Sequence, residues 1–380
     1  MTNSCDKKTI LVIGLDTIRQ KNLYQLIGLL DRGYRFVVIT TDWNSTSLVL
    51  TCGYGDINVR VAKLMHVRRD FLSLTIDALR RDKISLVELY PYSLLGFLCA
   101  LLVKAWRKPL LIIARGEEWY YLTKEMSRSQ RIWFRLTYAL ADGVLYKETY
   151  MRDLLDTWGI KRRWLLPNAI DLPKIVRQQK PDECHFIFLN SIKTFRHPEI
   201  PLSAFLELCA ERGLRGNSLV RMSVVGFLNE KTNPLVDAKE TQLRSMIAGL
   251  DVPVEYGPWT ATPEHWLDRA DVFLLPADVV YVNYALLEAM GRGMPAIIQD
   301  APNADLLVTD GEDGYILPLD KDVWKEKMAH FIDDASLRAR MGASARRKIA
   351  EHYSTGSYHY AYDCIYKNML RQQTIGTTET

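Results

Sequence analysis

Asn283, Tyr284 and Glu288 have the residue types and the spacing of an anion-binding helix start. They follow a Pro-marked loop and begin an expected short helix, with Glu288 about one turn after its start. The first turn of a helix has backbone N–H groups without intrahelical partners and lies at the positive end of the helix dipole. We therefore expect free N–H groups at residues 283–285 to bind an anion such as a diphosphate, and Glu288 to reach a polar group attached to it. The alternative is that Glu288 is a surface residue of an ordinary crossover helix.

The segments on either side of this helix read as one βαβ step. An apolar run at 272–275 precedes the loop at 276–283, Gly291 and Gly293 end the helix, and a second apolar run follows at 296–298. In a parallel sheet the ligand crevice lies beyond the carboxyl ends of the strands. The loop before Asn283 is therefore in position to meet a ligand.

Composition restricts the class of protein. The chain has 380 residues, 48% of them hydrophobic, and no biased tract, which predicts a globular protein of two domains. A net charge of +4 is too small to indicate a nucleic-acid partner, whereas anionic substrates stay open. The six cysteines form no Cys-x-x-Cys pair and the N-terminus has no signal-peptide pattern, which favours a cytoplasmic location.

Strand and helix patterns alternate along the chain and divide it into two α/β domains. Apolar runs at 9–14, 35–40 and 110–114 are separated by helical patterns, and the first turn lacks the Gly-x-Gly-x-x-Gly of a dinucleotide site. The pattern breaks at 164–171 and then resumes. We predict two doubly wound Rossmann-like domains facing a central cleft, at residues 1–170 and 171–355. A (β/α)8 barrel is the main alternative, although the break and the polar segment after it oppose one.

Residues 357–370 predict a C-terminal helix. Tyr358, Tyr362, Ile365, Tyr366 and Met369 recur at three- and four-residue spacing and give one apolar-aromatic face. We expect residues 356–372 to return to the N-terminal domain and to pack on it.

Two further segments of the first domain carry candidate contacts. Arg115, Glu117 and Glu118 directly follow a strand end, where an acceptor would bind, with helix capping and structural ion pairs as the alternative. The expected helix at 128–138 interleaves arginines with aromatic residues, which suits peripheral contact with an anionic membrane surface. A half-buried helix with a solvated basic edge is the competing interpretation. The apolar helix at 93–106 is too short to span a bilayer, so we expect it to be buried against the sheet.

A series of ordered motifs resembles a known family. LLPNAID, FIFLNSIKTFRHPEIPLSAF, RADVFLLPAD, LLEAMGRGMPAII and TDGEDGYIL are similar, in this order, to the C-terminal half of the family-4, retaining, GT-B-fold glycosyltransferases. The resemblance covers about residues 105–355 and is strongest from 255 to 350. It implies that the C-terminal domain holds a nucleotide-diphosphate sugar, that the N-terminal domain holds the acceptor, and that transfer occurs between them.

The resemblance also implies roles for individual residues. Glu288 matches the second Glu of the Glu-x7-Glu motif, which typically hydrogen-bonds the ribose, and Asn283 and Tyr284 match the turn whose amides meet the diphosphate or sugar. Lys193 and Arg196 fall where the family places cations against the diphosphate, a charge-assisted contact, and either can be the true match. These cations and Glu288 are the candidate catalytic residues.

Other donor-binding candidates are Trp259, Gly226 and Asp278. Trp259 lies in the loop near the nucleobase and would stack on it, or else pack the loop onto the core, and Gly226 ends the strand RMSVVG. The first Glu of the motif is replaced by Val280, and Asp278 is its candidate substitute.

The family's His-Gly appears as Arg115-Gly116, and the Asn-Gly of its hinge as Asn168-Ala169. Altered donor, altered acceptor or lost activity would each fit these departures.

Three functions remain open from the sequence. The first is a glycosyltransferase that moves a hexose-like sugar from a nucleotide sugar to a glycan or lipid-linked acceptor with retention. The second is a degenerate GT-B protein that binds a nucleotide sugar or a partner enzyme without catalysis, and the third is a membrane-surface scaffold.

Asp320-Lys321-Asp322 mimics a metal-binding Asp-x-Asp motif. Asp320, however, is positioned to cap a following helix, and Asp322 falls in the first turn of that helix. We therefore expect no metal site, and no cofactor other than the nucleotide sugar as co-substrate.

Overall fold

The computed structural model describes residues 7–14, 26–41, 55–63, 66–90, 93–114, 126–228 and 234–375. The chain divides into two compact units. Unit 1 comprises residues 1–167 and 355–380, and unit 2 comprises residues 168–354. The division after Pro167 lies close to the boundary expected after residue 170.

Unit 1 contains one seven-stranded parallel sheet in the order β3-β2-β1-β4-β5-β6-β7. Its strands are β1 (Lys8–Ile13), β2 (Tyr34–Thr40), β3 (Ile57–Val61), β4 (Ile84–Leu89), β5 (Leu110–Ala114), β6 (Gly143–Tyr146) and β7 (Arg163–Leu165). The helices named between them are α3 (Val67–Arg81), α4 (Ser93–Ala105), α6 (Arg128–Ala139) and α7 (Met151–Thr157). All five residues of β5 are buried, as expected for a parallel strand covered on both faces.

Unit 2 contains one six-stranded parallel sheet in the order β10-β9-β8-β11-β12-β13. Its strands are β8 (Cys184–Leu189), β9 (Val220–Phe227), β10 (Val254–Pro258), β11 (Val272–Leu275), β12 (Ala296–Gln299) and β13 (Gly314–Leu317). Its helices are α8 (Glu199–Arg212), α9 (Pro234–Ser245), α10 (Glu264–Leu267), α11 (Tyr284–Gly291), α12 (Ala304–Leu307), α13 (Lys321–Asp333) and α14 (Ala335–His352).

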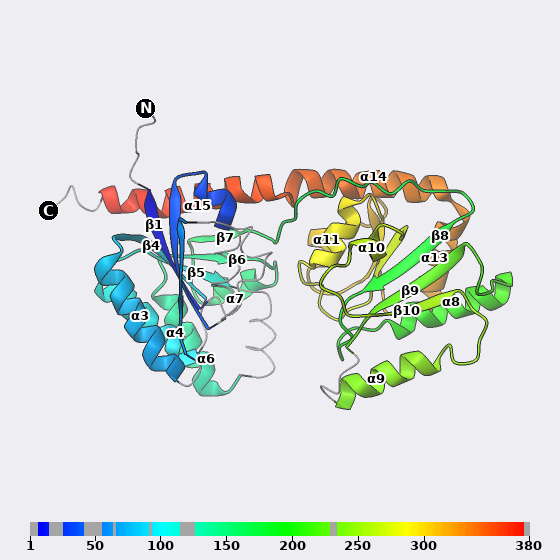
Figure 1. Cartoon of the computed structure of the whole chain (residues 1–380), viewed down its shortest axis with the longest axis horizontal. Coiled ribbons are helices and arrows are strands. Elements are labelled where there is room, and N and C mark those ends of the chain that lie inside the picture. The colour runs from blue at the N-terminus through cyan, green and yellow to red at the C-terminus, as the bar shows by residue number, and fades with distance from the viewer. Residues whose placement is uncertain are drawn as a thin grey trace. The chain divides into compact units, whose positions relative to one another are not determined.

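Helices cover both faces of the unit 2 sheet (Figure 1). Phe186 and Phe188 of β8 pack with the residues of α8 and α13, whereas Ile187 packs with those of α11 and α14. The period of two along β8 therefore sends alternate side chains into two cores. Two open parallel sheets exclude the (β/α)8 barrel, and the doubly wound architecture expected from the sequence is confirmed.

In each sheet the chain starts in the middle and reverses direction. In unit 2 it runs outward from β8 through β9 to β10, then returns to the other side of β8 and continues through β11 to β13. Loops that follow β8 and β11 therefore leave the sheet in opposite directions, and ligands bind at such a switch point. Unit 1 has the equivalent point between β1 and β4.

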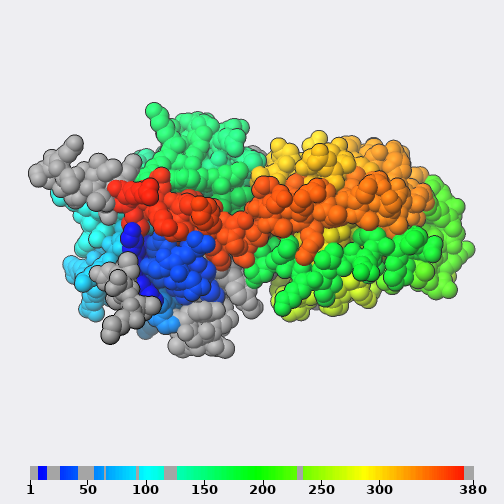
Figure 2. Space-filling model, turned by 90° about the horizontal axis from the view of Figure 1, so that it is seen from above, coloured from blue at the N-terminus to red at the C-terminus, as the bar shows by residue number. Residues whose placement is uncertain are grey.

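The C-terminal helix α15 (Thr355–Ile375) lies on unit 1, as predicted (red in Figure 2). All five residues of its expected apolar-aromatic face are at most 5% exposed. The Tyr362 and Tyr366 hydroxyls donate to Glu88 Oε1 of β4 at 2.6 and 2.7 Å. Burial raises the pKa of the Glu88 carboxyl to about 6, although both tyrosine hydrogen bonds act to lower it. A buried carboxyl thus joins α15 to the centre of the sheet.

Helix α4 differs from the expectation that it would be buried. Cys99, Ala100 and Val103 are fully covered, but Leu94, Leu98 and Leu101 on the other side of the helix are 36 to 41% exposed. The sheet covers one side only, so the apolar pattern around the whole helix overestimated its burial. Among the described residues, no helix has the length and apolarity needed to cross a bilayer.

Candidate functional site

The loops after β8 and β11 are hydrogen-bonded to each other at the switch point of unit 2. The His197 amide donates to the Pro276 carbonyl at 2.9 Å, and the Asp278 amide donates to the Phe195 carbonyl at 3.0 Å. These two bonds bring residues 193–197 beside residues 276–278, which are about eighty positions away in the sequence. Lys193, Arg196 and Asp278 therefore belong to one edge of the sheet.

The two cations on the first loop are held differently. The Arg196 guanidinium donates to the Ser191 carbonyl at 2.7 Å and to the Ser191 hydroxyl at 2.9 Å, and its side chain is half-buried. Lys193 is exposed, and its Nζ lies 5.8 Å from the centre of the Phe195 ring. Arg196 is thus fixed by the loop, while Lys193 has the conformational freedom to follow an anionic ligand.

His197 links this loop to Asp278 through its side chain. Its Nε2 lies 2.9 Å from Asp278 Oδ1 and its Nδ1 lies 3.3 Å from Glu199 Oε1. The hydrogen bond with Glu199 raises the pKa of His197, and Asp278 acts in the same direction although burial opposes both. Gln299 Nε2 adds a bond to Asp278 Oδ1 at 3.3 Å. One oxygen of Asp278 is therefore fixed by two donors, while its side chain stays 53% exposed.

This network was not predicted from the sequence. His197 stands next to Arg196 in the chain, but its partner Asp278, and Gln299 which donates to Asp278, come from two other strand ends. Only the strand order, which a single sequence does not reveal, brings them together. A histidine directly after a candidate phosphate-binding arginine was the one available signal.

The start of α11 corrects the expected anion site. The Asn283 carboxamide oxygen accepts from the Ala285 amide at 2.9 Å and from the Leu286 amide at 3.2 Å, so the N–H of Ala285 is not free. Asn is among the best N-cap residues because its oxygen satisfies these orphan donors. Asn283 Nδ2 in turn donates to Asn190 Oδ1 at 2.9 Å. The buried Asn190 Nδ2 has no hydrogen-bond partner among the described residues.

Two neighbouring positions on this segment have opposite environments. Val280, where the resemblance places a glutamate, is fully buried in the core of unit 2 and therefore makes no ligand contact. Asp278, two residues earlier, is exposed at the strand edge. Tyr284 and Glu288 lie in the first and second turns of α11, and both are half-buried.

Trp259 and Gly226 lie at the carboxyl ends of neighbouring strands. Trp259 directly follows β10 and is 54% exposed, so more than half of its surface is open to a ligand. Gly226 near the end of β9 has φ +137°, and a Cβ there would lie 1.8 Å from the Asn190 carbonyl oxygen. Glycine is required at this position because the loop after β8 crosses it closely.

Comparisons with known proteins match part of this domain and the fold of the chain. Residues 193–334 match the family described as glycosyl transferases group 1. This segment begins at Lys193 and contains Arg196, Asp278, Asn283 and Glu288. No curated protein sequence matches the chain.

Solved structures place the whole chain in the GT-B fold. Sucrose-phosphate synthase from Thermosynechococcus elongatus matches with a TM-score of 0.71 and 13% identity, over 96% of this chain and 100% of that one. A glycosyltransferase from Rickettsia africae matches with a TM-score of 0.73 and 12% identity, over 96% of this chain and 99% of that one. Anabaena HepE in complex with UDP matches with a TM-score of 0.72 and 14% identity, over 93% of this chain and 98% of that one. At these identities the likeness establishes the fold.

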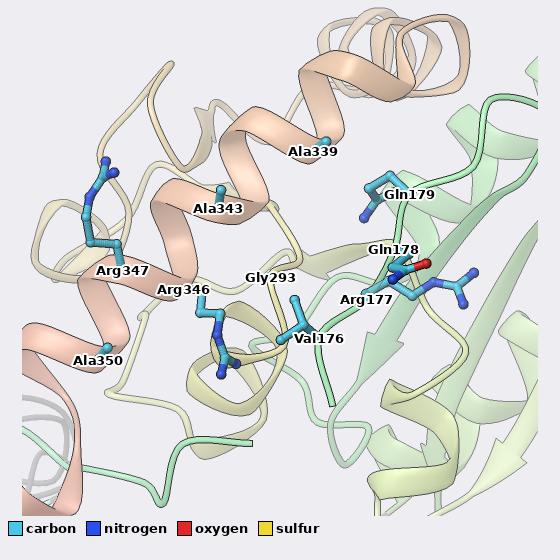
Figure 3. A pocket seen from close by; sticks show the side chains of 10 residues that line it. All are labelled: Val176, Arg177, Gln178, Gln179, Gly293, Ala339, Ala343, Arg346, Arg347 and Ala350. Carbon is cyan, nitrogen blue, oxygen red and sulfur yellow. The ribbon is translucent and has the colours of Figure 1, made fainter. Parts of the chain in front are cut away.

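A cavity of about 480 Å³ in the same domain lies away from these residues (Figure 3). It is formed by α14 and residues 176–179. Gly293, which lines it, follows the C-terminal end of α11, whereas Asn283 begins that helix. Arg177 in its wall is paired with Asp271 at 2.7 Å. The arginine thus serves to hold the segment that connects the units onto the domain.

Arg115, Glu117 and Glu118 lie outside the described residues. Asp320 caps α13 by accepting from the Asp322 amide at 2.8 Å and the Val323 amide at 3.2 Å, which confirms the capping interpretation of the Asp-x-Asp sequence. In the described part of the chain, no group of three or more His, Cys, Asp or Glu residues is arranged to hold a metal ion.

Proposed function

We propose that this protein is a glycosyltransferase that transfers a sugar from a nucleotide-diphosphate sugar to a glycan or lipid-linked acceptor with retention of configuration. The observation that carries the proposal is the convergence of Lys193, Arg196, Asp278 and the start of α11, the helix of Glu288, on the switch-point edge of the domain that matches the glycosyl transferases group 1 family. Cations, a helix start and carboxylates at this edge supply the groups that a nucleotide sugar requires.

In the proposed complex each group has a defined partner. Lys193 and Arg196 bind the diphosphate and stabilise its charge as it departs, without a metal ion or a protein nucleophile. Glu288 accepts from the ribose, Trp259 stacks on the base, and the helix start at Asn283 and Tyr284 lies beside the diphosphate. Unit 1 receives the acceptor, with Arg115, Glu117 and Glu118 as its proposed contacts.

Asp278 is the proposed contact to the donor sugar. Its Oδ1 is held by His197 and Gln299, and more than half of its side chain is exposed. A carboxylate fixed in this way can accept from a sugar hydroxyl with little further ordering. In this proposal it takes the role that the buried Val280 cannot perform.

The competing function is a GT-B protein that binds a nucleotide sugar without catalysis. Val280 in place of the first motif glutamate, and an N–H at Ala285 already bonded to Asn283, both favour it. The two functions differ in turnover rather than in binding.

The experiment is to incubate the purified chain with a panel of nucleotide sugars. UDP-glucose is the first donor to test because one HepE structure holds it. We expect slow donor hydrolysis, reduced in Lys193→Ala but not in Lys174→Ala, an exposed lysine of the same unit. Binding without turnover supports the non-catalytic alternative, and absence of binding to every donor refutes both.

A further inference from the structure

We infer that the surface formed by α4 and α6 of unit 1 docks onto an anionic lipid bilayer. These two helices lie side by side (Figure 1), and the rings of Phe97 and Trp133 join them at a centroid distance of 5.2 Å. They differ from the rest of unit 1 in two independent properties, exposed apolar side chains and unbalanced positive charge. We call this surface the α4/α6 face.

The first property is the clustering of exposed apolar side chains. Among the described residues of unit 1, five of the six large apolar or aromatic side chains that are exposed belong to these two helices. They are Leu94, Leu98 and Leu101 of α4 and Ile132 and Leu136 of α6, with exposed fractions between 36 and 57%. Single exposed apolar residues are ordinary, but a cluster on adjacent helices marks an interaction surface.

The second property is the charge of the same face. Arg128, Arg131 and Arg135 of α6 are exposed, and none is in an ion pair with a described residue. Neither helix contains an Asp or a Glu. Among the described residues, Asp142 lies close to α4 and is paired with Lys104 of that helix at 2.7 Å. The described residues of the face therefore carry a net positive charge, and their complement is an anionic surface.

The helical period places the two properties together. Phe134, Thr137 and Tyr138 are the buried residues of α6, so positions 128, 132, 135 and 136 project away from the core, and the exposed Arg131 lies at the edge of the buried side. The capping box between Ser127 and Gln130 fixes the start of the helix and hence this orientation. Arginines beside leucine and isoleucine are the pattern of helices that lie in a membrane interface.

A bilayer fits this face better than a nucleic acid or a folded acidic partner. Nucleic acid would use the arginines but leave five exposed apolar side chains without a role. A bilayer uses both, because apolar side chains enter the boundary below the headgroups while guanidinium groups bind lipid phosphates. Docking would hold unit 1 at the surface where a lipid-linked acceptor resides, but the inference does not depend on the proposed sugar transfer.

The test is co-sedimentation of the full chain with vesicles of phosphatidylcholine alone and of phosphatidylcholine with phosphatidylglycerol. We expect binding to the anionic vesicles, weakening as salt is added, and little binding to the neutral ones. Arg128→Gln with Arg135→Gln should reduce partitioning by about 30-fold, which corresponds to about 1 kcal/mol for each cation. The matched control is Arg68→Gln with Arg80→Gln, two exposed arginines of α3 in the same unit, which should bind as the parent does.

A second pair of variants tests the apolar part. Ile132→Ser with Leu136→Ser should reduce binding at least tenfold, at about 0.8 kcal/mol per buried CH₂ group. Leu235→Ser with Leu250→Ser, which changes exposed leucines of unit 2, should have no effect. Because all eight side chains are exposed, thermal unfolding should be unchanged in each variant. The inference is overturned if the parent does not bind anionic vesicles, or if the control pairs lose binding as much as the α4/α6 pairs.

Discussion

Replacing Glu88 with glutamine should remove a pH-dependent component of the stability of unit 1. Glu88 is fully buried in β4, and its folded-state pKa of about 6 lies above the ordinary value of 4.5. The folded state therefore holds the proton more tightly than the unfolded state. The contribution of Glu88 is most favourable below pH 4.5 and is lost as the pH rises through about 6. A difference of about 1.5 pKa units corresponds to about 2 kcal/mol.

Glutamine keeps an oxygen for the Tyr362 and Tyr366 hydroxyls but cannot ionise. We expect the stability of Glu88→Gln relative to the parent to rise by about 2 kcal/mol between about pH 4 and about pH 7.5. Urea unfolding of both proteins at each pH, followed in the transition of unit 1, measures their free energies of unfolding. Subtracting the parent from the variant removes the contributions of the titratable groups that both proteins share. Tyr366→Phe removes one donor to the carboxylate and should enlarge the pH dependence. A stability difference that is the same at both pH values would refute the assignment.

The remaining predictions concern the proposed donor site. Glu288→Ala should weaken nucleotide-sugar binding by about 1 to 3 kcal/mol in calorimetry and leave unfolding unchanged, because a half-buried residue on a short helix contributes more to the ligand than to the core. Asp278→Asn preserves an oxygen for His197 but removes the charge, and turnover should fall by roughly 10- to 100-fold, whereas wild-type turnover would show that the sugar is held elsewhere. Asn283→Ala should destabilise unit 2 by about 1 kcal/mol through loss of the N-cap, and it should tighten diphosphate binding because it frees the amides of Ala285 and Leu286. Activity should survive excess EDTA, and Asp322→Asn should cost only a few tenths of a kcal/mol, so that restoration of a chelated enzyme by Mg²⁺ or Mn²⁺ would contradict the metal-free proposal.

Local sequence patterns were sufficient to predict those features of the fold that depend on one segment of the chain alone. The strand at 272–275, the cap at Asp320 and the buried face of the C-terminal helix are all readable from residue type and spacing. Apolar runs form buried parallel strands, and an aspartate just before a helical pattern caps the helix. Apolar residues at three- and four-residue spacing form one apolar face of a helix. None of these depends on which strands are neighbours.

Contacts between distant segments could not be predicted in the same way. His197 reaches Asp278 because β8 and β11 are adjacent, and Glu88 meets Tyr362 because α15 crosses β4. The sequence shows Glu88 only as a polar residue in an apolar run. Tyr362, whose hydrogen bond offsets the cost of burying the Glu88 carboxyl, lies more than 270 positions away in the sequence.

Asn283 shows how two correct local rules can compete for the same atoms. The rule that helix starts bind anions and the rule that asparagine caps helices both apply to the first turn of α11, and both use the amides of Ala285 and Leu286. Without a ligand the cap is always the nearer acceptor, so it occupies these donors. A diphosphate can use them only if the Asn283 carboxamide turns away, and its other hydrogen bond, to Asn190, must then break too. Any binding energy gained at the helix start is therefore reduced by the loss of the cap, which is why Lys193 and Arg196 are the stronger candidates for holding the diphosphate.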